Sequence, residues 1–219
     1  MDPREDQKRA AAQAAAELVS EGSRVGLGSG STVAHFLVAL ARRKLEITCV
    51  ATSPATEETS RTLGLTVQPF DLLDRLDIAV DGADQVDSDL WLVKGGGGAH
   101  TREKVVAASA DRFVVIVCAE KIVDRIGPPV PLEVLRFGLA STLRRLAEIG
   151  DAALREGAAP TPDGNLIVDF LGKVEGREEL ASLLSDVPGV VDHGLFPPAL
   201  VSEVLVGRAD GSVERILPS

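Results

Sequence analysis

The sequence predicts an α/β protein with an open, mostly parallel, doubly wound (Rossmann-like) sheet and a second, smaller ferredoxin-like α+β domain. In the first half, helices alternate with short apolar runs such as 113–118, which is typical of parallel strands buried on both faces. In the second half the expected order becomes β-α-β-β-α-β, the ferredoxin-like arrangement. The glycine- and proline-rich segment 127–131 separates the halves. We therefore predict an α/β domain of residues 1–127 plus 200–219 and a ferredoxin-like domain of residues 128–199.

Local composition and periodicity predict each element of the first half. An alanine-rich segment before Gly22 indicates the first helix, and Val33, Phe36 and Leu40 share one face of the second. Short β-branched runs indicate the strands. The expected order is helix 4–19, strand 24–27, helix 31–43, strand 47–51, helix 55–63, strands 65–69, 77–80 and 90–93, helix 99–110 and strand 113–118.

Turn and cap residues organise the second half. Gly150 ends a predicted helix, and the segment 160–165 predicts a turn. The Asp210-Gly211 pair predicts a hairpin near the C-terminus, whose strands return to the first sheet. The expected order is strand 132–134, helix 137–149, strands 152–155 and 166–170, helix 177–184, strand 190–195, and hairpin strands 201–206 and 212–216.

Composition and charge argue against several classes of partner. The 219 residues are 45% hydrophobic and 26% charged, as in an ordinary globular protein, and the net charge is −10. A field of that sign repels nucleic acid and anionic membranes, so an anionic small substrate needs a local positive site. Cys49 and Cys118 lie in apolar runs and predict buried free thiols of a reducing compartment. No apolar run approaches the roughly 20 residues of a spanning helix, and we expect a cytoplasmic protein.

Three unusual segments directly follow predicted strands. They are 26–32 (GLGSGST), 81–84 (DGAD) and 94–98 (KGGGG). Ligands of open α/β sheets bind beyond the carboxyl ends of the strands, so we expect all three segments at one edge of the sheet.

The first segment has the features of a phosphate loop. Its glycines let a ligand approach the backbone, the following helix offers free N–H groups, and Ser29, Ser31 and Thr32 add hydroxyl donors. Alternatively, Ser31 is only the N-cap of that helix. A dinucleotide site is disfavoured, because the spacing is G-x-G-x-G and the nearest acid, Glu46, precedes the second strand.

The other two segments offer carboxylates and a cation. Asp81 and Asp84 could polarise hydroxyls, pass protons or share a metal, or they could merely cap a local turn. Lys94 precedes four glycines, which are entropically costly unless their amides or their tight path are needed. A lysine there can stabilise a phosphate or a developing oxyanion, whereas the alternative is a flexible loop.

Glu103 is the candidate general base. Acids in the first turn of a helix often only complement its dipole, but Glu103 closely follows the glycine run and could point into the same pocket. His100 is the rival base, and Lys121 follows a fourth strand end. The three histidines are scattered, so we expect neither a transition-metal site nor a nucleophilic triad.

With these residues identified, the sequence closely resembles the type A ribose-5-phosphate isomerase family. The most specific match is the pair of blocks DGAD at 81–84 and KGGG-x-x-x-TREK at 94–104. Two positions depart from the family pattern: Ser29 stands where threonine is usual, and His100 stands at an often apolar position. Neither departure removes a group that the chemistry needs. Further matches cover essentially the whole chain: 28–32, 52–53, 55–57, Lys121, Pro131, 133–134, 164–165 and 194–196.

The resemblance implies a cofactor-free interconversion of D-ribose 5-phosphate and D-ribulose 5-phosphate through a cis-enediolate, in the non-oxidative branch of the pentose phosphate pathway. Glu103 would move a proton between carbons 2 and 1. Asp81 would assist ring opening and hydroxyl proton exchange, while Lys94 and Asp84 would orient and stabilise the enediolate oxygens. It also implies a homodimer or homotetramer, with the ferredoxin-like part taking part in assembly.

The resemblance implies the substrate-binding residues as well, with Lys8 as a further candidate for the phosphate. They are Ser29, Gly30, Ser31, Thr32, Asp81, Gly82, Ala83, Asp84, Lys94, Gly95, Gly96, Gly97 and Lys121. Two other functions are open. A sugar-phosphate-sensing domain without catalysis would not need Glu103 but would carry a DNA-binding segment. A CoA-transferase-like enzyme would need a glutamate as acyl acceptor.

Overall fold

The computed structural model describes residues 3–218 and divides the chain into two compact units. Unit 1 takes the chain up to Ala83, then Arg102–Ile122, and then the chain from Pro198 onward. Unit 2 takes Asp84–Thr101 and Val123–Pro197. The predicted division into an α/β domain of residues 1–127 plus 200–219 and a ferredoxin-like domain of residues 128–199 stays a prediction. Unit 2 is larger than that domain mainly because it includes the segment 84–101.

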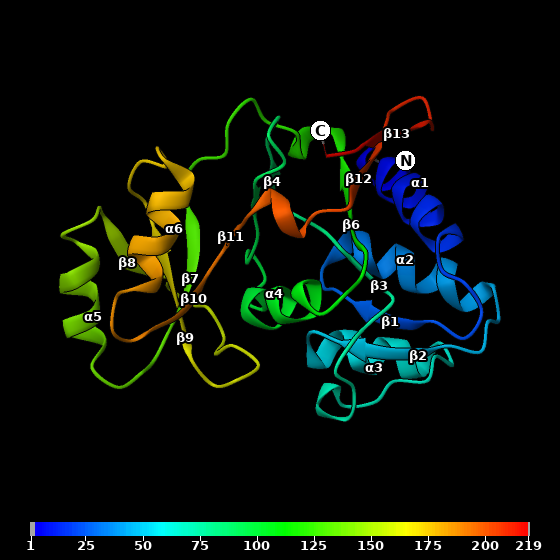
Figure 1. Cartoon of the computed structure of the whole chain (residues 1–219), viewed down its shortest axis with the longest axis horizontal. Coiled ribbons are helices and arrows are strands. Elements are labelled where there is room, and N and C mark those ends of the chain that lie inside the picture. The colour runs from blue at the N-terminus through cyan, green and yellow to red at the C-terminus, as the bar shows by residue number, and fades with distance from the viewer. Residues whose placement is uncertain (1–2, 219) are drawn as a thin grey trace. The chain divides into compact units, whose positions relative to one another are not determined.

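Unit 1 contains a six-stranded sheet in the order β13-β12-β6-β3-β1-β2, labelled in Figure 1. The first five strands along the chain are parallel, and only β13 is antiparallel to its neighbour. This is the predicted open, mostly parallel sheet, and its return by a C-terminal hairpin is confirmed. The strands are β1 Arg24–Leu27, β2 Thr48–Ala51, β3 Ile78–Asp81, β6 Phe113–Cys118, β12 Glu203–Gly207 and β13 Val213–Ile216.

Helices pack on both faces of this sheet, as the doubly wound fold predicts. Side chains of α1 (Pro3–Glu17) and α2 (Ser31–Arg42) share one core with Val25 and Leu27 of β1. Gly26, between them, points to the other face, where a Cβ would lie 2.5 Å from Val106 Cγ1 of α4 (His100–Ala108). The helix α3 (Pro54–Thr62) follows β2, and short 3-10 turns η1, η2 and η3 span Phe70–Leu72, Ala119–Lys121 and Pro198–Leu200.

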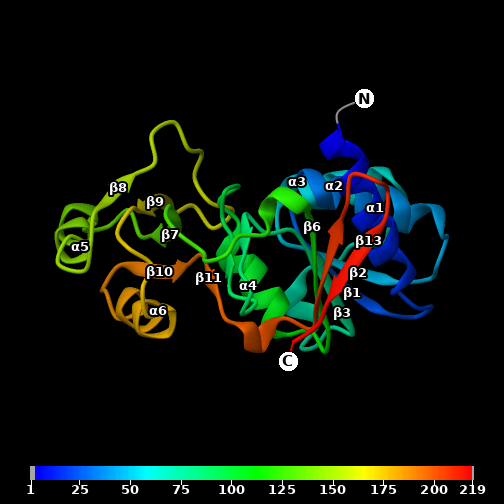
Figure 2. The same cartoon turned by 90° about the horizontal axis from the view of Figure 1, so that it is seen from above.

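Unit 2 contains a four-stranded antiparallel sheet in the order β10-β7-β9-β8 (Figure 2). With two intervening helices this is the β-α-β-β-α-β arrangement, so the ferredoxin-like prediction is confirmed. Its core joins apolar side chains of the sheet, such as Leu132 and Phe170, to Leu146 and Leu184 of the helices. The elements are β7 Val130–Val134, α5 Leu139–Leu146, β8 Ala152–Leu154, β9 Leu166–Phe170, α6 Arg177–Ser185 and β10 Val190–His193.

A third, three-stranded sheet in unit 2 corrects two predictions. It has the order β11-β5-β4, formed by Leu195–Phe196, Leu92–Val93 and Gln85–Val86. The predicted strand 190–195 is therefore two strands in two sheets. The chain changes sheets at Gly194, where a Cβ would lie 2.1 Å from the Lys94 carbonyl oxygen. The strand before the glycine run 94–98, β5, likewise belongs to this sheet and not to the six-stranded one. The shared edge of this run with the segments 26–32 and 81–84 stays a prediction.

The predicted strand 65–69 is absent, and no membrane-spanning helix is found among the described residues. The segment 65–69 forms only an isolated bridge between Val67 and Cys49, with a neighbouring backbone bond from Gln68 to Cys49. Among residues 3–218, no helix combines the length and the apolar character that crossing a membrane requires.

Candidate functional site

The first loop of unit 1 lies where the strand order of the six-stranded sheet reverses. β1 is followed in the chain by β2 on one side, while β3 lies on its other side. Open α/β sheets bind ligands beyond the carboxyl ends of such a strand pair. The loop starts with Gly28, whose amide donates to the Val80 carbonyl of β3 at 2.9 Å. The segments 26–32 and 81–84 therefore meet, as predicted.

Asp81 lies directly against this loop. A Cβ on Gly28 would lie 2.0 Å from the Asp81 carboxylate, so glycine is required for the two to approach. Asp81 is 3% exposed, and its Oδ1 accepts hydrogen bonds from the backbone amides of Ser29 at 3.0 Å and Gly82 at 2.7 Å. These bonds hold the buried carboxylate in one orientation at the end of β3. A residue that only capped a local turn would not need to be buried in this way, so the geometry favours a functional role for Asp81.

Ser29 also connects the loop to Glu103. The Ser29 hydroxyl donates to Glu103 Oε1 at 2.5 Å, while its amide donates to Asp81. Glu103 lies in the first turn of α4 and is 5% exposed. A glutamate that served only the helix dipole would face solvent, so this geometry favours a functional role. The structure thus brings Ser29, Asp81 and Glu103 together.

Ser31 and Thr32 of the phosphate loop begin α2 without capping it. The N-cap is Gly30, with φ +97, a conformation that favours glycine, so the N-cap interpretation of Ser31 is wrong. Ser31 is the exposed first residue of the helix, and Thr32 is half-buried. The first helical bond runs from Ala34 to the Gly30 carbonyl, which leaves the amides before it without an intrahelical acceptor.

The nearby residues Ser53 and Thr56 have supporting roles. Ser53 caps α3 by accepting from the Thr56 amide at 3.2 Å. The Thr56 hydroxyl donates to the Gly28 carbonyl at 2.9 Å and so fixes the start of the phosphate loop.

The two candidate lysines of unit 1 lie on different elements. Lys121 ends η2 directly after β6, at the same carboxyl edge of the sheet as Ser29 and Asp81. Lys8 lies on α1, where its Nζ donates to Glu5 Oε1 at 2.7 Å. Glu5 also bonds His35, and the hydrogen bond from Lys8 is the main cause that lowers the pKa of Glu5 to about 2. A contact of Lys8 with phosphate stays a prediction.

In unit 2, the glycine run is a tightly held turn and not a flexible loop. The Lys94 amide donates to the Gly194 carbonyl at 2.9 Å, and Gly98 closes a turn onto the Gly95 carbonyl at 3.0 Å. The Gly96 amide donates to Asp84 Oδ2 at 2.8 Å. The structure therefore brings Asp84 together with the glycine run.

Three of the four glycines are required by their surroundings. Gly95 has φ +104, and a Cβ there would lie 2.6 Å from His100 Nδ1. At Gly96 a Cβ would lie 2.9 Å from Asp84 Oδ1, and Gly98 has φ +77. A Cβ on Gly97 would meet no described atom within 4 Å. The predicted need for a tight backbone path thus explains why glycine stands at positions 95, 96 and 98.

Lys94 and His100 are both buried beside this turn. Lys94 is 3% exposed, and its Nζ lies 5.5 Å from the centroid of the Phe196 ring, within reach of a cation–π interaction. His100 is fully buried and packs against Gly95, a location that suits a packing role better than a base that must meet substrate.

Sequence reasoning missed Arg155 and Asp169. Arg155 Nη1 donates to the Gly95 and Gly96 carbonyls at 3.2 Å and 3.0 Å. The rest of its guanidinium binds Asp169 side-on, at 2.8 Å from Nε and 2.5 Å from Nη2. The hydrogen bond to Asp169 is the main cause that raises the pKa of Arg155. Both residues lie in a predicted strand region, where a charged side chain normally indicates only an exposed face.

Glu133 was part of the resemblance without a stated role. It is 1% exposed in β7, and its carboxylate accepts from Thr101 Oγ1 at 2.5 Å, Thr161 Oγ1 at 2.7 Å and Asn165 Nδ2 at 2.7 Å. Thr101 is the second residue of α4, so Glu133 ties the start of this helix to the turn at 161–165. The three donors to Glu133 come from distant parts of the chain, so its structural role is visible only in the fold and not in the sequence.

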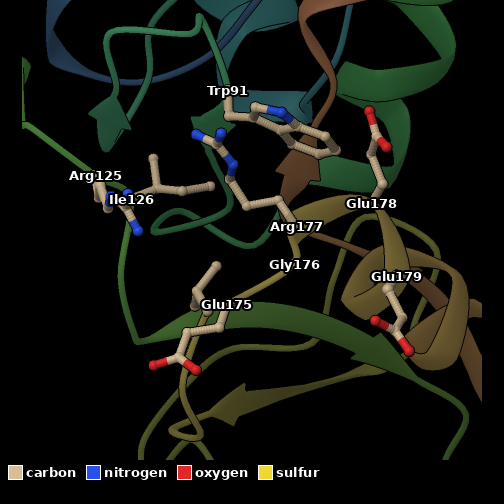
Figure 3. Close-up of a pocket in the computed structure, with 9 residues that line it drawn as sticks. Trp91, Arg125, Ile126, Glu175, Gly176, Arg177, Glu178 and Glu179 are labelled. Atoms are coloured by element: carbon tan, nitrogen blue, oxygen red, sulfur yellow. The ribbon is translucent and has the colours of Figure 1, made fainter.

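A separate cavity of about 450 Å³ in unit 2 contains none of the predicted site residues. Figure 3 shows the Arg177 side chain beside the Trp91 ring, whose centroid lies 5.8 Å from the guanidinium carbon. Arg177 forms ion pairs with Asp87 and Asp89.

Within the described part of the chain, no group of three or more histidine, cysteine or acidic side chains has an arrangement that could hold a metal ion.

A family model, curated relatives and solved structures at more than 30% identity point to one family. The family model "Ribose 5-phosphate isomerase A (phosphoriboisomerase A)" matches residues 48–211. Ribose-5-phosphate isomerase A of Rhodopseudomonas palustris (strain TIE-1) is 45% identical, over 98% of this chain and all of that protein. The solved structure from Methanocaldococcus jannaschii has a TM-score of 0.91 at 34% identity, covering 96% of this chain and 97% of that one. A D-ribose-5-phosphate isomerase in complex with phospho-erythronic acid has a TM-score of 0.92 at 31% identity, covering 98% and 99%.

Proposed function

The chain belongs to the ribose 5-phosphate isomerase A family, and we propose that it interconverts D-ribose 5-phosphate and D-ribulose 5-phosphate through a cis-enediolate, with Glu103 as the general base. The observation that carries the proposal is the double role of Ser29, whose amide holds Asp81 and whose hydroxyl holds Glu103. Two buried carboxylates with separate hydrogen bonds at a sheet switch point suit two separate proton transfers.

Glu103 removes the proton from carbon 2 of the open-chain aldose and returns a proton to carbon 1. The hydrogen bond from Ser29 fixes the direction of its carboxylate, which matters because a base must lie within hydrogen-bond reach of the proton that it takes. A positioned carboxylate of this kind typically contributes about 100- to 10,000-fold to the rate.

Asp81 assists the steps on oxygen. Ring opening requires a proton to leave one hydroxyl and another to reach the ring oxygen, and the enediolate must exchange a proton between its two oxygens. We assign these transfers to the Asp81 carboxylate, which the Ser29 and Gly82 amides hold in one orientation through Oδ1.

Lys94, Asp84 and the glycine run stabilise the enediolate. Removing a proton beside a carbonyl leaves negative charge on oxygen, and a cation or backbone amide directed at that oxygen is worth roughly 3 kcal/mol or more. Lys94 supplies the charge and Asp84 orients a substrate hydroxyl. Gly96 holds Asp84 through its amide, and Gly95 and Gly97 supply amides. The loop Ser29–Thr32 and Lys121 bind the phosphate end, a role consistent with the phosphorylated ligand of a structurally similar isomerase.

The test is turnover of ribose 5-phosphate by the purified full chain, with and without EDTA and in D2O. We expect activity that EDTA does not change and deuterium at carbon 1 of ribulose 5-phosphate. Exchange can be partial where the base is shielded from water. Loss of activity with the chelator, or no deuterium after prolonged equilibration, would contradict the enediolate route. Binding of ribose 5-phosphate without turnover would favour the sugar-phosphate-sensing alternative.

A further inference from the structure

We propose that Arg155, held by Asp169, is a positioning residue for the isomerisation, because it fixes two peptide planes of the glycine run. The amide of the first binds Asp84, and the amide of the second, that of Gly97, is the one that we assign to the reacting oxygens. This inference rests on the proposed function. It concerns how the residues of unit 2 to which we assign stabilisation of the enediolate are held in place. Neither Arg155 nor Asp169 belongs to the residues that the sequence indicated.

The geometry of one peptide bond is the basis of the inference. The Gly95 carbonyl and the Gly96 amide belong to the same planar trans peptide, so they point in opposite directions. Arg155 Nη1 binds the carbonyl end at 3.2 Å, and Asp84 Oδ2 binds the amide end at 2.8 Å. A contact at one end therefore sets the direction of the other. Asp84, the peptide, Arg155 and Asp169 form one continuous chain of hydrogen bonds.

The next peptide is held in the same way. Arg155 Nη1 also binds the Gly96 carbonyl at 3.0 Å, which fixes the direction of the Gly97 amide. Gly96 and Gly97 are both exposed, so these two peptides are the part of the run that a substrate can reach. Glycine has no side chain through which its conformation could be held, and its backbone freedom is the largest of any residue. An external clamp on the carbonyls is the remaining way to order such a segment.

Arginine suits this task and lysine does not. The planar guanidinium presents two N–H groups side-on to Asp169 while a third nitrogen faces the two carbonyls. A lysine ammonium can reach only a part of this set and has no fixed plane. The positive charge beside the carbonyls also polarises each peptide toward a stronger N–H donor at its other end.

The consequence falls on the rate and not on ground-state binding. Amides directed at an oxyanion act mainly in the transition state, and a misplacement of about 1 Å can cost roughly 100-fold. For Arg155→Lys and Arg155→Ala we expect kcat to fall about 10- to 100-fold, with KM within about threefold. Asp169→Asn should lower kcat by a smaller factor. Adding it to Arg155→Ala should change little further, because Asp169 acts through Arg155.

The chain offers a matched control in Arg24. Its Nε and Nη2 bind Asp77 side-on, as those of Arg155 bind Asp169, but at the start of β1, the opposite end of the strands from Asp81. Arg24→Lys breaks the same kind of ion pair without touching the glycine run. We expect it to lower the melting temperature about as much as Arg155→Lys does, and to leave kcat unchanged.

Chemical rescue separates positioning from folding. Ethylguanidinium added to Arg155→Ala should restore at least about tenfold in kcat, whereas ethylammonium or urea at the same concentration should not. The inference is overturned if folded Arg155→Lys keeps kcat within about twofold of wild type. It is also overturned if kcat falls only in proportion to the folded fraction, without rescue. If Arg155→Ala does not fold, Asp169→Asn is the test. A lower kcat with nearly unchanged KM supports the inference, and a kcat equal to wild type overturns it.

The failure of this inference can be told apart from the failure of the proposed function. If wild type does not turn over ribose 5-phosphate, or Glu103→Gln stays active, the proposed function is wrong whatever Arg155 does. If both of these behave as proposed and Arg155→Lys equals wild type, only the clamp is wrong.

Discussion

The two glycine-rich loops solve different problems. In unit 1, Gly28 clears space for the Asp81 carboxylate, and the two functional carboxylates, Asp81 and Glu103, are side chains on regular elements. In unit 2, the run 95–98 acts through its backbone: the Gly96 amide binds Asp84, and the Gly97 amide is the one that we assign to the substrate. No rotamer can place such backbone amides. They depend on outside side chains, namely Asp84 on one end of a peptide and Arg155 on the other. The comparison teaches that a backbone site needs supporting residues that a side-chain site does not.

The first prediction tests the side-chain half of this comparison and has the largest expected effect. Glu103→Gln keeps the size and the hydrogen bond from Ser29 but cannot accept a proton, so kcat should fall about 100- to 10,000-fold while KM stays within about threefold. Steady-state kinetics in both directions measure it. Glu178→Gln is the control, because Glu178 also lies in the first turn of a helix and should matter little. More than about a tenth of wild-type activity would sink the assignment and make His100 the next candidate.

A second prediction compares the glycines of the two loops. Gly28→Ala forces the Asp81 carboxylate away from the Ser29 and Gly82 amides, so we expect kcat to fall about 100-fold. Gly96→Ala meets only the end of the Asp84 side chain, at 2.9 Å, and should cost about tenfold, less than a lost oxyanion donor. Equal losses would show that the two loops are not held differently. Gly127→Ala, with open space among the described atoms, is the control.

The third prediction concerns the phosphate. Ser31→Ala with Thr32→Ala should raise KM about tenfold with kcat nearly unchanged, because two hydroxyl contacts bind ground and transition state alike. Free ribose should be a very poor substrate. Thr59→Ala with Thr62→Ala removes two hydroxyls of α3 that only bond their own helix, and should leave KM unchanged. Efficient turnover of free ribose would remove the phosphate role from the loop.

The smallest effect on rate is expected at Glu133. Glu133→Gln keeps the shape but mismatches one of three donors, so the free energy of unfolding should fall by about 1–3 kcal/mol. We expect kcat to stay within about threefold. Urea unfolding followed by circular dichroism measures the first and turnover the second. A variant as stable as wild type would mean that the bonds to Thr101, Thr161 and Asn165 contribute little.

Sequence patterns predicted what is local and missed what joins distant segments. The parallel strands and the ferredoxin-like order follow from apolar runs, and the loop at Ser29 and the carboxylate of Asp81 follow from strand ends. Arg155 lies 59 residues along the chain from Gly96, whose carbonyl it binds. Asp169 follows Arg155 after a turn, and only the fold brings the two side chains together at the glycine run. The break at Gly194 depends on close approach to the Lys94 carbonyl, which no property of the neighbouring residues signals.

The path of the chain has a consequence for synthesis on the ribosome. β6 is buried along its whole length and pairs with β3 on one side and β12 on the other. Because β12 is Glu203–Gly207, the ribosome must add more than eighty residues, including most of unit 2, before the second edge of β6 can be covered. During that interval an apolar strand with unpaired backbone groups is open to the wrong partner. The nascent chain is therefore most vulnerable to aggregation while unit 2 is emerging, and the last strands to be made are the ones that end this exposure.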